Sequence, residues 1–273
     1  MPALVRRHPR LIAAASTLAA TGLCLLAAAP PASAQTTARY VALGDSYSSG
    51  VGAGSYISSS GSCDRSTKAY SQLWANANDP ASYVSVACSG ATTSSVISSQ
   101  LSALSSSTTL VSITVGGNDV GFASTMETCV LDSTSTCLSA ISTDETKIAN
   151  DLPGELNNVL SGIRSRAPSA RVVVLDYPEL YDLSKSSSCI GLSTSDRTAL
   201  NGAADQLDSA IQAAAGRYSD PFVDVRPYFA GHEICDSSSW LHSVNWLDLD
   251  ESYHPTAAGQ AYAYYPAFSY GAG

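Results

Sequence analysis

Basic side chains are scarce in this sequence. Its 273 residues contain 14 Lys and Arg against 23 Asp and Glu, and Arg6, Arg7 and Arg10 account for three of the basic ones. Residues 35–273 therefore carry 11 basic and 23 acidic side chains, a net charge of −12. Nucleic acid and anionic membranes repel such a chain at long range, so we expect neither as a main partner.

Several metal-binding and catalytic motifs are also absent. The sequence has no C-x₂-C or H-x₃-H spacing for zinc and no D-x-D-x-D-G loop for calcium. The G-x-S-x-G elbow of α/β-hydrolases does not occur around Ser46, where the chain reads G-D-S-Y-S. No internal repeat or long linker is present, so residues 35–273 are expected to form one domain with a sizeable core.

The first 34 residues have the pattern of a secretory signal peptide. Three arginines precede an Ala/Leu-rich run, and Ala32-Ser33-Ala34 is a small-residue cleavage site before Gln35. Polar residues interrupt the apolar run, which argues against a permanent membrane span. We therefore expect residues 1–34 to be removed and the protein to be secreted.

Six cysteines follow the predicted cleavage site, and an even number in an exported chain indicates disulfides. Sequence alone allows 15 pairings of six cysteines. We favour pairing in chain order, because Cys129 and Cys137 lie close together in a predicted loop between regular elements. The expected bridges are Cys63–Cys88, Cys129–Cys137 and Cys189–Cys235.

Short apolar runs alternate with helical periodicity along the chain. Strands are predicted at 40–43, 83–87, 110–115 and 172–175, with a weaker one at 222–225. Apolar side chains recur at helical spacing in 151–168, with Asp151 as a cap, and again in 198–218. This alternation predicts a three-layer α/β sandwich with a mostly parallel sheet. The Ser/Thr-rich stretches 55–62, 92–109 and 184–188 are predicted to be loops.

Polar motifs follow the predicted strands, at the edge where open α/β sheets form their sites. They read Gly-Asp-Ser (44–46), Cys-Ser-Gly-Ala (88–91) and Gly-Gly-Asn-Asp (116–119), and Glu-Ser-Tyr-His-Pro (251–255) stands near the C terminus. Together they supply the parts of an acyl-transfer site. Ser46 is the candidate nucleophile and His254 the base that would take its proton.

An oxyanion formed in such a reaction needs fixed donors. The main-chain N–H groups of Ser46 and Gly90 and the side-chain amide of Asn118 are the candidates. Asp45 is expected to hold the turn by hydrogen bonding and not to act as a base. His232 and His242 lack a matching context and are expected to be structural.

The four motifs resemble the conserved blocks of the GDSL, or SGNH, hydrolases. GDSYSSG, CSGA, GGND and SYHPTAAG occur in order between residues 40 and 260, and the details are most similar to secreted actinobacterial lipases and phospholipases A1. The resemblance implies a flavodoxin-like fold and a Ser–His mechanism without a metal or other cofactor. It maps the nucleophile to Ser46, the oxyanion donors to Gly90 and Asn118, and the base to His254.

One position departs from the family pattern. The wider family places an Asp three residues before the histidine, whereas Glu251 occupies that position here. Either the Glu251 carboxylate orients His254, or a main-chain carbonyl does so, as in the most similar subgroup. We favour the Ser252 carbonyl, with a Ser–His dyad as the functional unit.

The expected function is therefore carboxylic ester hydrolysis by a secreted, monomeric enzyme. Lipid esters are the favoured substrates, either acylglycerols or phospholipids, with transient contact to lipid aggregates. A carbohydrate esterase that removes acetyl groups from polysaccharide is the alternative with the same mechanism. A non-catalytic secreted binding module is the alternative from a different class.

Overall fold

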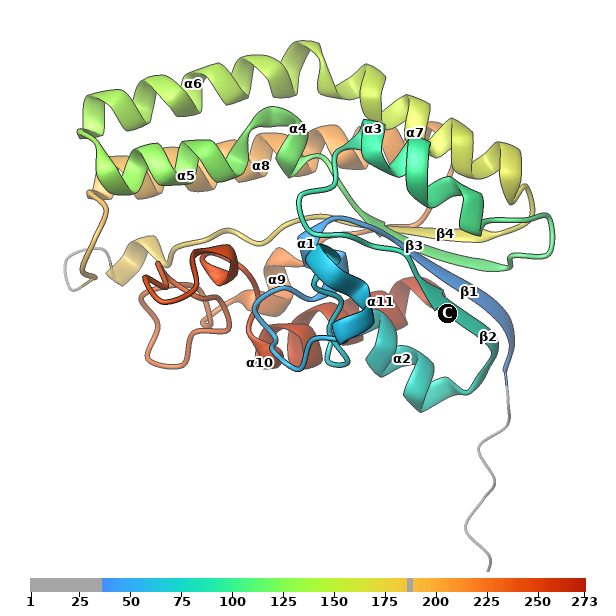
Figure 1. The fold of residues 1–273 in the computed structure, drawn as a ribbon. Helices are drawn as coiled ribbons and strands as arrows, with labels where there is room; N and C mark the ends of the chain where they lie inside the picture. The colour runs from blue at the N-terminus through green and yellow to red at the C-terminus, as the bar shows by residue number, and fades with distance from the viewer. Residues whose placement is uncertain (1–35, 186–188) are drawn as a thin grey trace, which may run out of the picture. The chain divides into compact units, whose positions relative to one another are not determined.

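The computed structural model describes residues 36–185 and 189–273 (Figure 1). The predicted signal peptide, residues 1–34, lies outside the described residues, as do residues 35 and 186–188. Within the described part of the chain, no helix is both long and apolar enough to cross a bilayer.

Parallel strands form a five-stranded sheet in the order β2-β1-β3-β4-β5. All the apolar runs found in the sequence become strands: β1 (Thr36–Gly44), β2 (Pro80–Ser85), β3 (Leu110–Thr114), β4 (Arg171–Leu175) and β5 (Phe222–Val223). Every residue of the central strand β3 is buried, because helices cover both faces of the sheet. The predicted three-layer architecture is confirmed, and its strand order is that of flavodoxin-like folds.

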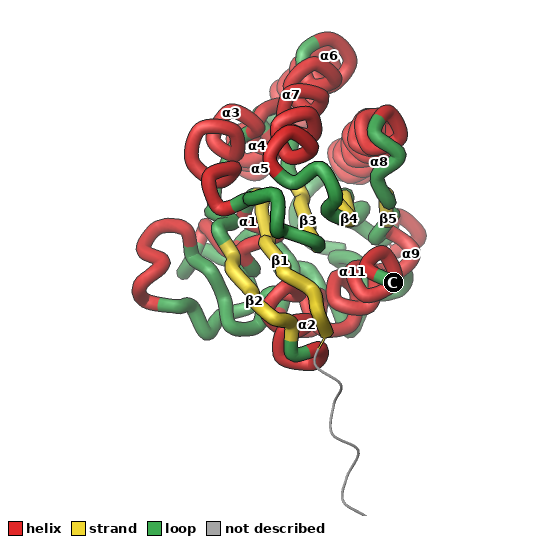
Figure 2. The backbone as a smooth tube through the Cα atoms, turned by 90° about the vertical axis from the view of Figure 1, so that its right-hand side faces the viewer, coloured by secondary structure: helices red, strands yellow, loops and turns green. Residues whose placement is uncertain are grey.

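Figure 2 shows the strands between two groups of helices. One group contains α3 (Thr93–Ser95), α4 (Gly117–Val120), α5 (Phe122–Leu131), α6 (Thr134–Asn150), α7 (Leu152–Arg166) and α8 (Thr194–Arg217). The other contains α2 (Tyr70–Asn78), α9 (Arg226–Phe229), α10 (Ala257–Gly259) and α11 (Tyr265–Ala272). The short helix α1 (Ser46–Ser49) follows directly on β1. Single turns of 3₁₀ helix occur at Leu183–Lys185 and Leu249–Glu251, and a π-helical turn at Gln260–Tyr264.

The two helices predicted from apolar periodicity are α7 and α8. The predicted stripe on α7 is buried along its length, from Leu152 to Ile163. Asp151 occupies the position before α7, but its side chain makes no capping bond, so that detail of the prediction is wrong. Helix α8 begins four residues before the predicted segment, because Ser193 and Asp196 form a capping box there.

Serine-rich segments differ most from the prediction. The stretch 92–109 is not simply a loop, because it contains α3, a π-helical turn at Val96–Gln100 and a 3₁₀ turn at Leu101–Ala103. The stretch 55–62 likewise overlaps a 3₁₀ segment at Ser58–Cys63. Serine lowers helix propensity by only a few tenths of a kcal/mol per residue. Burial of Val96 and Leu101 stabilises these helical turns by more than the low helix propensity of the serines destabilises them.

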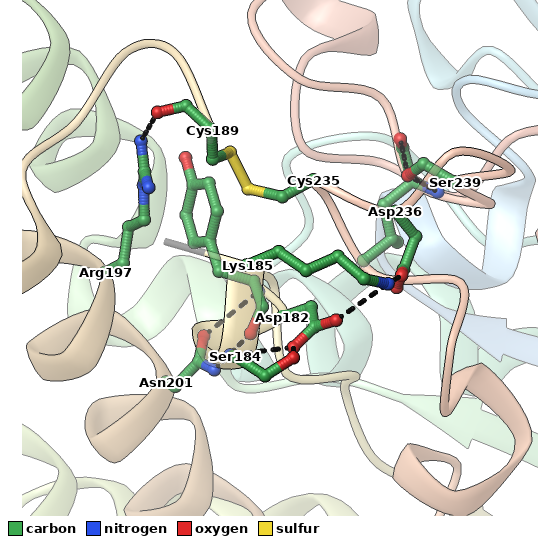
Figure 3. The surroundings of a disulfide bond; sticks show 11 residues. Asp182, Ser184, Lys185, Cys189, Arg197, Asn201, Cys235, Asp236 and Ser239 are labelled. Carbon is green, nitrogen blue, oxygen red and sulfur yellow. Dashed lines mark hydrogen bonds and ion pairs between the residues drawn. A yellow bond between two sulfur atoms is a disulfide. The ribbon is translucent and has the colours of Figure 1, made fainter. Parts of the chain in front are cut away.

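Three disulfides join the cysteines in chain order: Cys63–Cys88, Cys129–Cys137 and Cys189–Cys235. Cys129 lies in α5 and Cys137 in α6, so the expectation that both occupy a loop is wrong. Figure 3 shows the surroundings of the third bridge. Lys185 forms ion pairs with Asp182 and Asp236 beside it, and the pair with Asp236 connects the same two segments as the disulfide.

Candidate active site

The turn after β1 presents Ser46 at the carboxyl edge of the sheet. Gly44 has a φ of +121°, and a side chain there would collide with the Thr114 carbonyl. Asp45 caps α1, because its Oδ1 accepts a hydrogen bond from the Tyr47 N–H at 3.0 Å. This confirms the expectation that Asp45 holds the turn. Ser46 is thus placed by a backbone that favours glycine and by a side-chain cap.

His254 contacts Ser46 although 208 positions separate them in the sequence. Its Nε2 lies 2.7 Å from Ser46 Oγ, and its Nδ1 lies 2.9 Å from the main-chain oxygen of Ser252. A carbonyl oxygen can only accept a hydrogen bond, so Nδ1 carries the proton and Nε2 presents its lone pair to the hydroxyl. A histidine in this state can remove the proton from serine.

Glu251, the other candidate for orienting His254, is engaged elsewhere. Its Oε1 accepts a hydrogen bond from the Tyr56 hydroxyl at 2.7 Å, and Tyr56 Oη accepts one from the Gly52 N–H at 3.0 Å. Glu251 is therefore tied to the loop that follows α1. Of the two arrangements left open by the sequence, the structure brings the Ser252 carbonyl to the imidazole.

We expect Glu251→Ala to lower kcat by less than about tenfold, and not by the factor of about 10⁴ that follows disruption of a triad carboxylate. The measurement is the hydrolysis of a dissolved p-nitrophenyl ester, with His254→Ala compared in the same assay. Glu251→Gln is the matched control, because it keeps the acceptor for Tyr56 and removes the charge. A loss equal to that of His254→Ala would assign the carboxylate to the catalytic unit.

Two further turns bring hydrogen-bond donors to the same edge. Gly90, with a φ of +73°, follows β2 and lines the cavity beside Ser46. Asn118 lies at the start of α4, and its Nδ2 donates a hydrogen bond to the Ala91 carbonyl at 3.0 Å. That bond fixes the carboxamide and uses one of its two N–H groups, so the other remains available to a substrate oxygen.

Tyr177, which the sequence did not single out, ties two of these turns together. Its hydroxyl donates a hydrogen bond to Asp45 Oδ2 at 2.5 Å and accepts one from the Gly117 N–H at 3.1 Å. The side chain thereby links the turn of Ser46 to the turn of Asn118. Its only signal in the sequence is a position just after β4, at the same edge of the sheet.

Asp119 links the turns after β2 and β3. Its carboxylate accepts hydrogen bonds from the N–H and the hydroxyl of Thr93, at 3.0 and 2.6 Å. The GGND motif therefore carries two different tasks: Asn118 faces the cavity beside Ser46, and its neighbour holds the Gly90 turn in place. The motif alone did not distinguish them.

A cavity of about 520 Å³ begins at Ser46 and His254 and extends between α5, α6 and α8. Its wall includes the buried apolar side chains Val120, Met126, Ile141, Ile148, Leu200 and Leu207. Asp144 lies on the same wall, and burial raises the pKa of its carboxyl. The volume is within the range of ligand pockets, about 300–1,000 Å³. An apolar group attached to a reacting ester can therefore be buried in this cavity, away from solvent.

Desolvation lowers the pKa of His254 from 6.5 to about 4, despite its hydrogen bond to Ser252. The neutral imidazole is the form that accepts the serine proton, so lowering the pKa keeps the base active at more acid pH. We expect kcat/KM to fall as the pH drops through about 4, because the imidazole then becomes protonated. Circular dichroism at each pH separates titration from acid unfolding. Burial also raises the pKa of Asp45 to about 7, so the test includes Asp45→Asn. An acid limb centred near pH 6.5 in that variant, with the fold intact, would contradict the lowered pKa of His254.

The remaining described histidines bind main-chain oxygens, as expected of structural residues. His232 Nδ1 lies 2.7 Å from the Ser238 carbonyl, and its ring stacks on Trp240. His242 Nε2 lies 2.8 Å from the Gly52 carbonyl. Over residues 36–185 and 189–273, no three His, Cys, Asp or Glu side chains are grouped so as to hold a metal ion.

Comparison with known proteins agrees with this geometry. A family model described as the GDSL-like Lipase/Acylhydrolase family matches residues 42–262, which is most of the chain. The protein is thus a carboxylic ester hydrolase. It belongs to the GDSL-like lipase/acylhydrolase family, and the resemblance carried by the four sequence motifs is confirmed.

Full-length relatives come from Streptomyces. Lipase 1 of Streptomyces coelicolor is 54% identical over 266 residues, which cover 96% of this chain and 98% of the relative. The crystal structure of phospholipase A1 from Streptomyces albidoflavus NA297 matches with a TM-score of 0.83 and 54% identity, covering 85% of this chain and 98% of that one. The extracellular lipase of Streptomyces rimosus matches with the same TM-score, 51% identity and the same coverage of both chains.

Proposed function

We propose that this enzyme is a secreted lipase or phospholipase that hydrolyses lipid esters through an acyl-enzyme at Ser46. The observation that supports this substrate class most directly is the apolar cavity that opens beside the Ser46 hydroxyl. Relatives named lipase and phospholipase A1 at about 50% identity point to the same class of substrate. Both acylglycerols and phospholipids present an ester bond attached to an apolar chain, so both fit the proposal.

In the proposed reaction, Ser46 Oγ attacks the acyl carbonyl while His254 Nε2 takes the hydroxyl proton. The oxyanion that forms is stabilised by the N–H groups of Ser46 and Gly90 and by the Asn118 amide. His254 then protonates the leaving alcohol. Water, deprotonated by His254, attacks the acyl-enzyme, and His254 returns the proton to Ser46 Oγ as the bond to the acyl group breaks and the fatty acid is released. The Ser252 carbonyl holds the imidazole tautomer throughout, and it stabilises the imidazolium less than a carboxylate would.

A filled-cavity variant tests the substrate class. Ala204 lies on α8 and lines the cavity, so Ala204→Phe is expected to reduce the space for an acyl chain. We expect kcat/KM for p-nitrophenyl octanoate to fall by about tenfold or more, while that for the acetate stays near the wild-type value. Ala213→Phe is the matched control, because Ala213 lies on the same helix, is exposed and does not line the cavity. Equal losses for both esters would argue against acyl-chain binding in this cavity.

The same assay separates the alternatives. A carbohydrate esterase would prefer acetylated xylan and p-nitrophenyl acetate over phosphatidylcholine and the octanoate. A non-catalytic binding module would hydrolyse none of them and would not react at Ser46 with an organophosphate. We expect turnover of the octanoate and of phosphatidylcholine, and covalent labelling of Ser46.

The proposal includes the processing and assembly of the chain. Residues 1–34 act as a signal peptide, and residues 35–273 are exported as one monomeric domain with no cofactor. The extracellular lipase of Streptomyces rimosus supports this destination by its similarity. N-terminal sequencing of the protein from culture medium tests it, with Gln35 as the expected first residue.

A further inference from the structure

Several large apolar side chains at the cavity are exposed to solvent instead of being buried. Leu131, Trp246 and Leu249 line the cavity and are 61%, 67% and 61% exposed. Leu247 lies in the same segment, does not line the cavity and is 98% exposed. We call Leu131, Trp246, Leu247 and Leu249 the apolar rim. Exposed large apolar groups that adjoin a binding cavity mark an interaction surface.

We propose that the apolar rim docks the enzyme on a zwitterionic lipid surface, an inference that rests on the proposed function. The rim is continuous with the cavity that leads to Ser46, so a surface seated on it would deliver an acyl chain into that cavity. Trp246 suits this position, because tryptophan favours the boundary between water and the acyl region of a lipid layer.

Charge around the rim selects the kind of lipid surface. Asp248, Asp250 and Glu251 surround Leu249, and residues 227–273 contain no Lys or Arg. Residues 35–273 carry a net charge of −12, so an anionic surface repels the protein. In phosphatidylcholine the outermost group is a quaternary ammonium, which is complementary to these carboxylates, and the net charge of the lipid is zero.

Leu247→Asp tests the rim without altering the cavity. Its matched control is Tyr270→Asp, which adds the same charge at an exposed aromatic residue on α11. Tyr270 precedes Gly271, whose carbonyl binds Arg171 at the start of β4, so it lies at the opposite edge of the sheet from Ser46. Binding is measured in a Ser46→Ala background by sedimentation with phosphatidylcholine vesicles. Because this variant lacks the nucleophile, the binding measurement does not depend on whether the lipid is a substrate.

We expect Leu247→Asp to weaken vesicle binding by about tenfold or more and Tyr270→Asp to leave it unchanged. Neither variant is expected to alter kcat/KM for dissolved p-nitrophenyl butyrate in the active enzyme. Tryptophan emission should shift to the blue on binding, and the shift should disappear in Trp246→Phe, because Trp246 is more exposed than Trp74 or Trp240.

Added anionic lipid should weaken binding at low salt, and about 1 M NaCl should remove the difference by shortening the Debye length to about 3 Å. The proposal would be overturned if Leu247→Asp bound vesicles as tightly as the wild type, or if Tyr270→Asp lost as much affinity as Leu247→Asp. Stronger binding of the wild type to anionic than to zwitterionic vesicles would also overturn it. Vesicle binding by an active enzyme that hydrolyses neither phosphatidylcholine nor an acylglycerol would instead contradict the proposed function and leave the docking surface standing.

Discussion

Replacing Ser46 by alanine is expected to lower kcat by about 10⁴-fold or more while the fold is retained. Without Oγ no acyl-enzyme forms, and the oxyanion donors can only assist a direct attack by water. The expected effect on stability is small, because α1 keeps its Asp45 cap and alanine is a good helix former. Residual turnover is measured with p-nitrophenyl butyrate, and thermal unfolding checks the fold.

Two additional variants sharpen this test. His254→Ala is expected to lose nearly as much activity as Ser46→Ala, since the two side chains act as one unit across the 2.7 Å contact. For the same reason the double variant should be no slower than Ser46→Ala alone. Turnover retained in folded Ser46→Ala would remove the serine from its proposed role, and additive losses would show that the two residues act separately.

Replacing Asn118 by alanine is expected to lower kcat by about 10²- to 10³-fold with little change in KM. The side-chain amide faces the cavity and is held in position by the Ala91 carbonyl. Its remaining N–H would donate a strong hydrogen bond to the substrate carbonyl oxygen only when negative charge develops on that oxygen. The variant therefore destabilises the transition state and not the bound substrate. Rates with the dissolved butyrate ester give kcat and KM separately.

A transition-state analogue distinguishes this role from a structural one. An alkyl boronic acid that adds to Ser46 should bind Asn118→Ala more weakly than it binds the wild type, by about the same factor as the fall in kcat. Asn150→Ala is the control, because Asn150 is exposed on α6, its amide donates a hydrogen bond to the Thr146 carbonyl of the same helix, and it does not line the cavity. A parallel loss of thermal stability and of KM, with analogue binding unchanged, would instead indicate that Asn118 merely supports the turn.

The sheet and the two long helices were predictable because their causes are local. The run 172–175 contains no polar side chain, which is typical of a short strand buried on both faces. The stripe from Leu152 to Ile163 likewise specifies one buried face of a helix. Segment 92–109 escaped prediction, since its helical turns depend on packing of Val96 and Leu101 against the core and not on the propensity of its serines.

The amino-acid sequence by itself determined the alternation of strands and helices, the four polar motifs after the strands, and hence the expected class of enzyme. Tertiary structure decided which partner each polar atom has. It placed the Ser252 carbonyl against His254 and drew Glu251 to Tyr56, and it joined Asp45 to Gly117 through Tyr177. It also formed the apolar cavity by packing α8 against the earlier helices α5 and α6. Periodicity indicates which face of an element is buried, whereas a contact such as that between Tyr56 and Glu251, across 195 positions, depends on how those faces pack together.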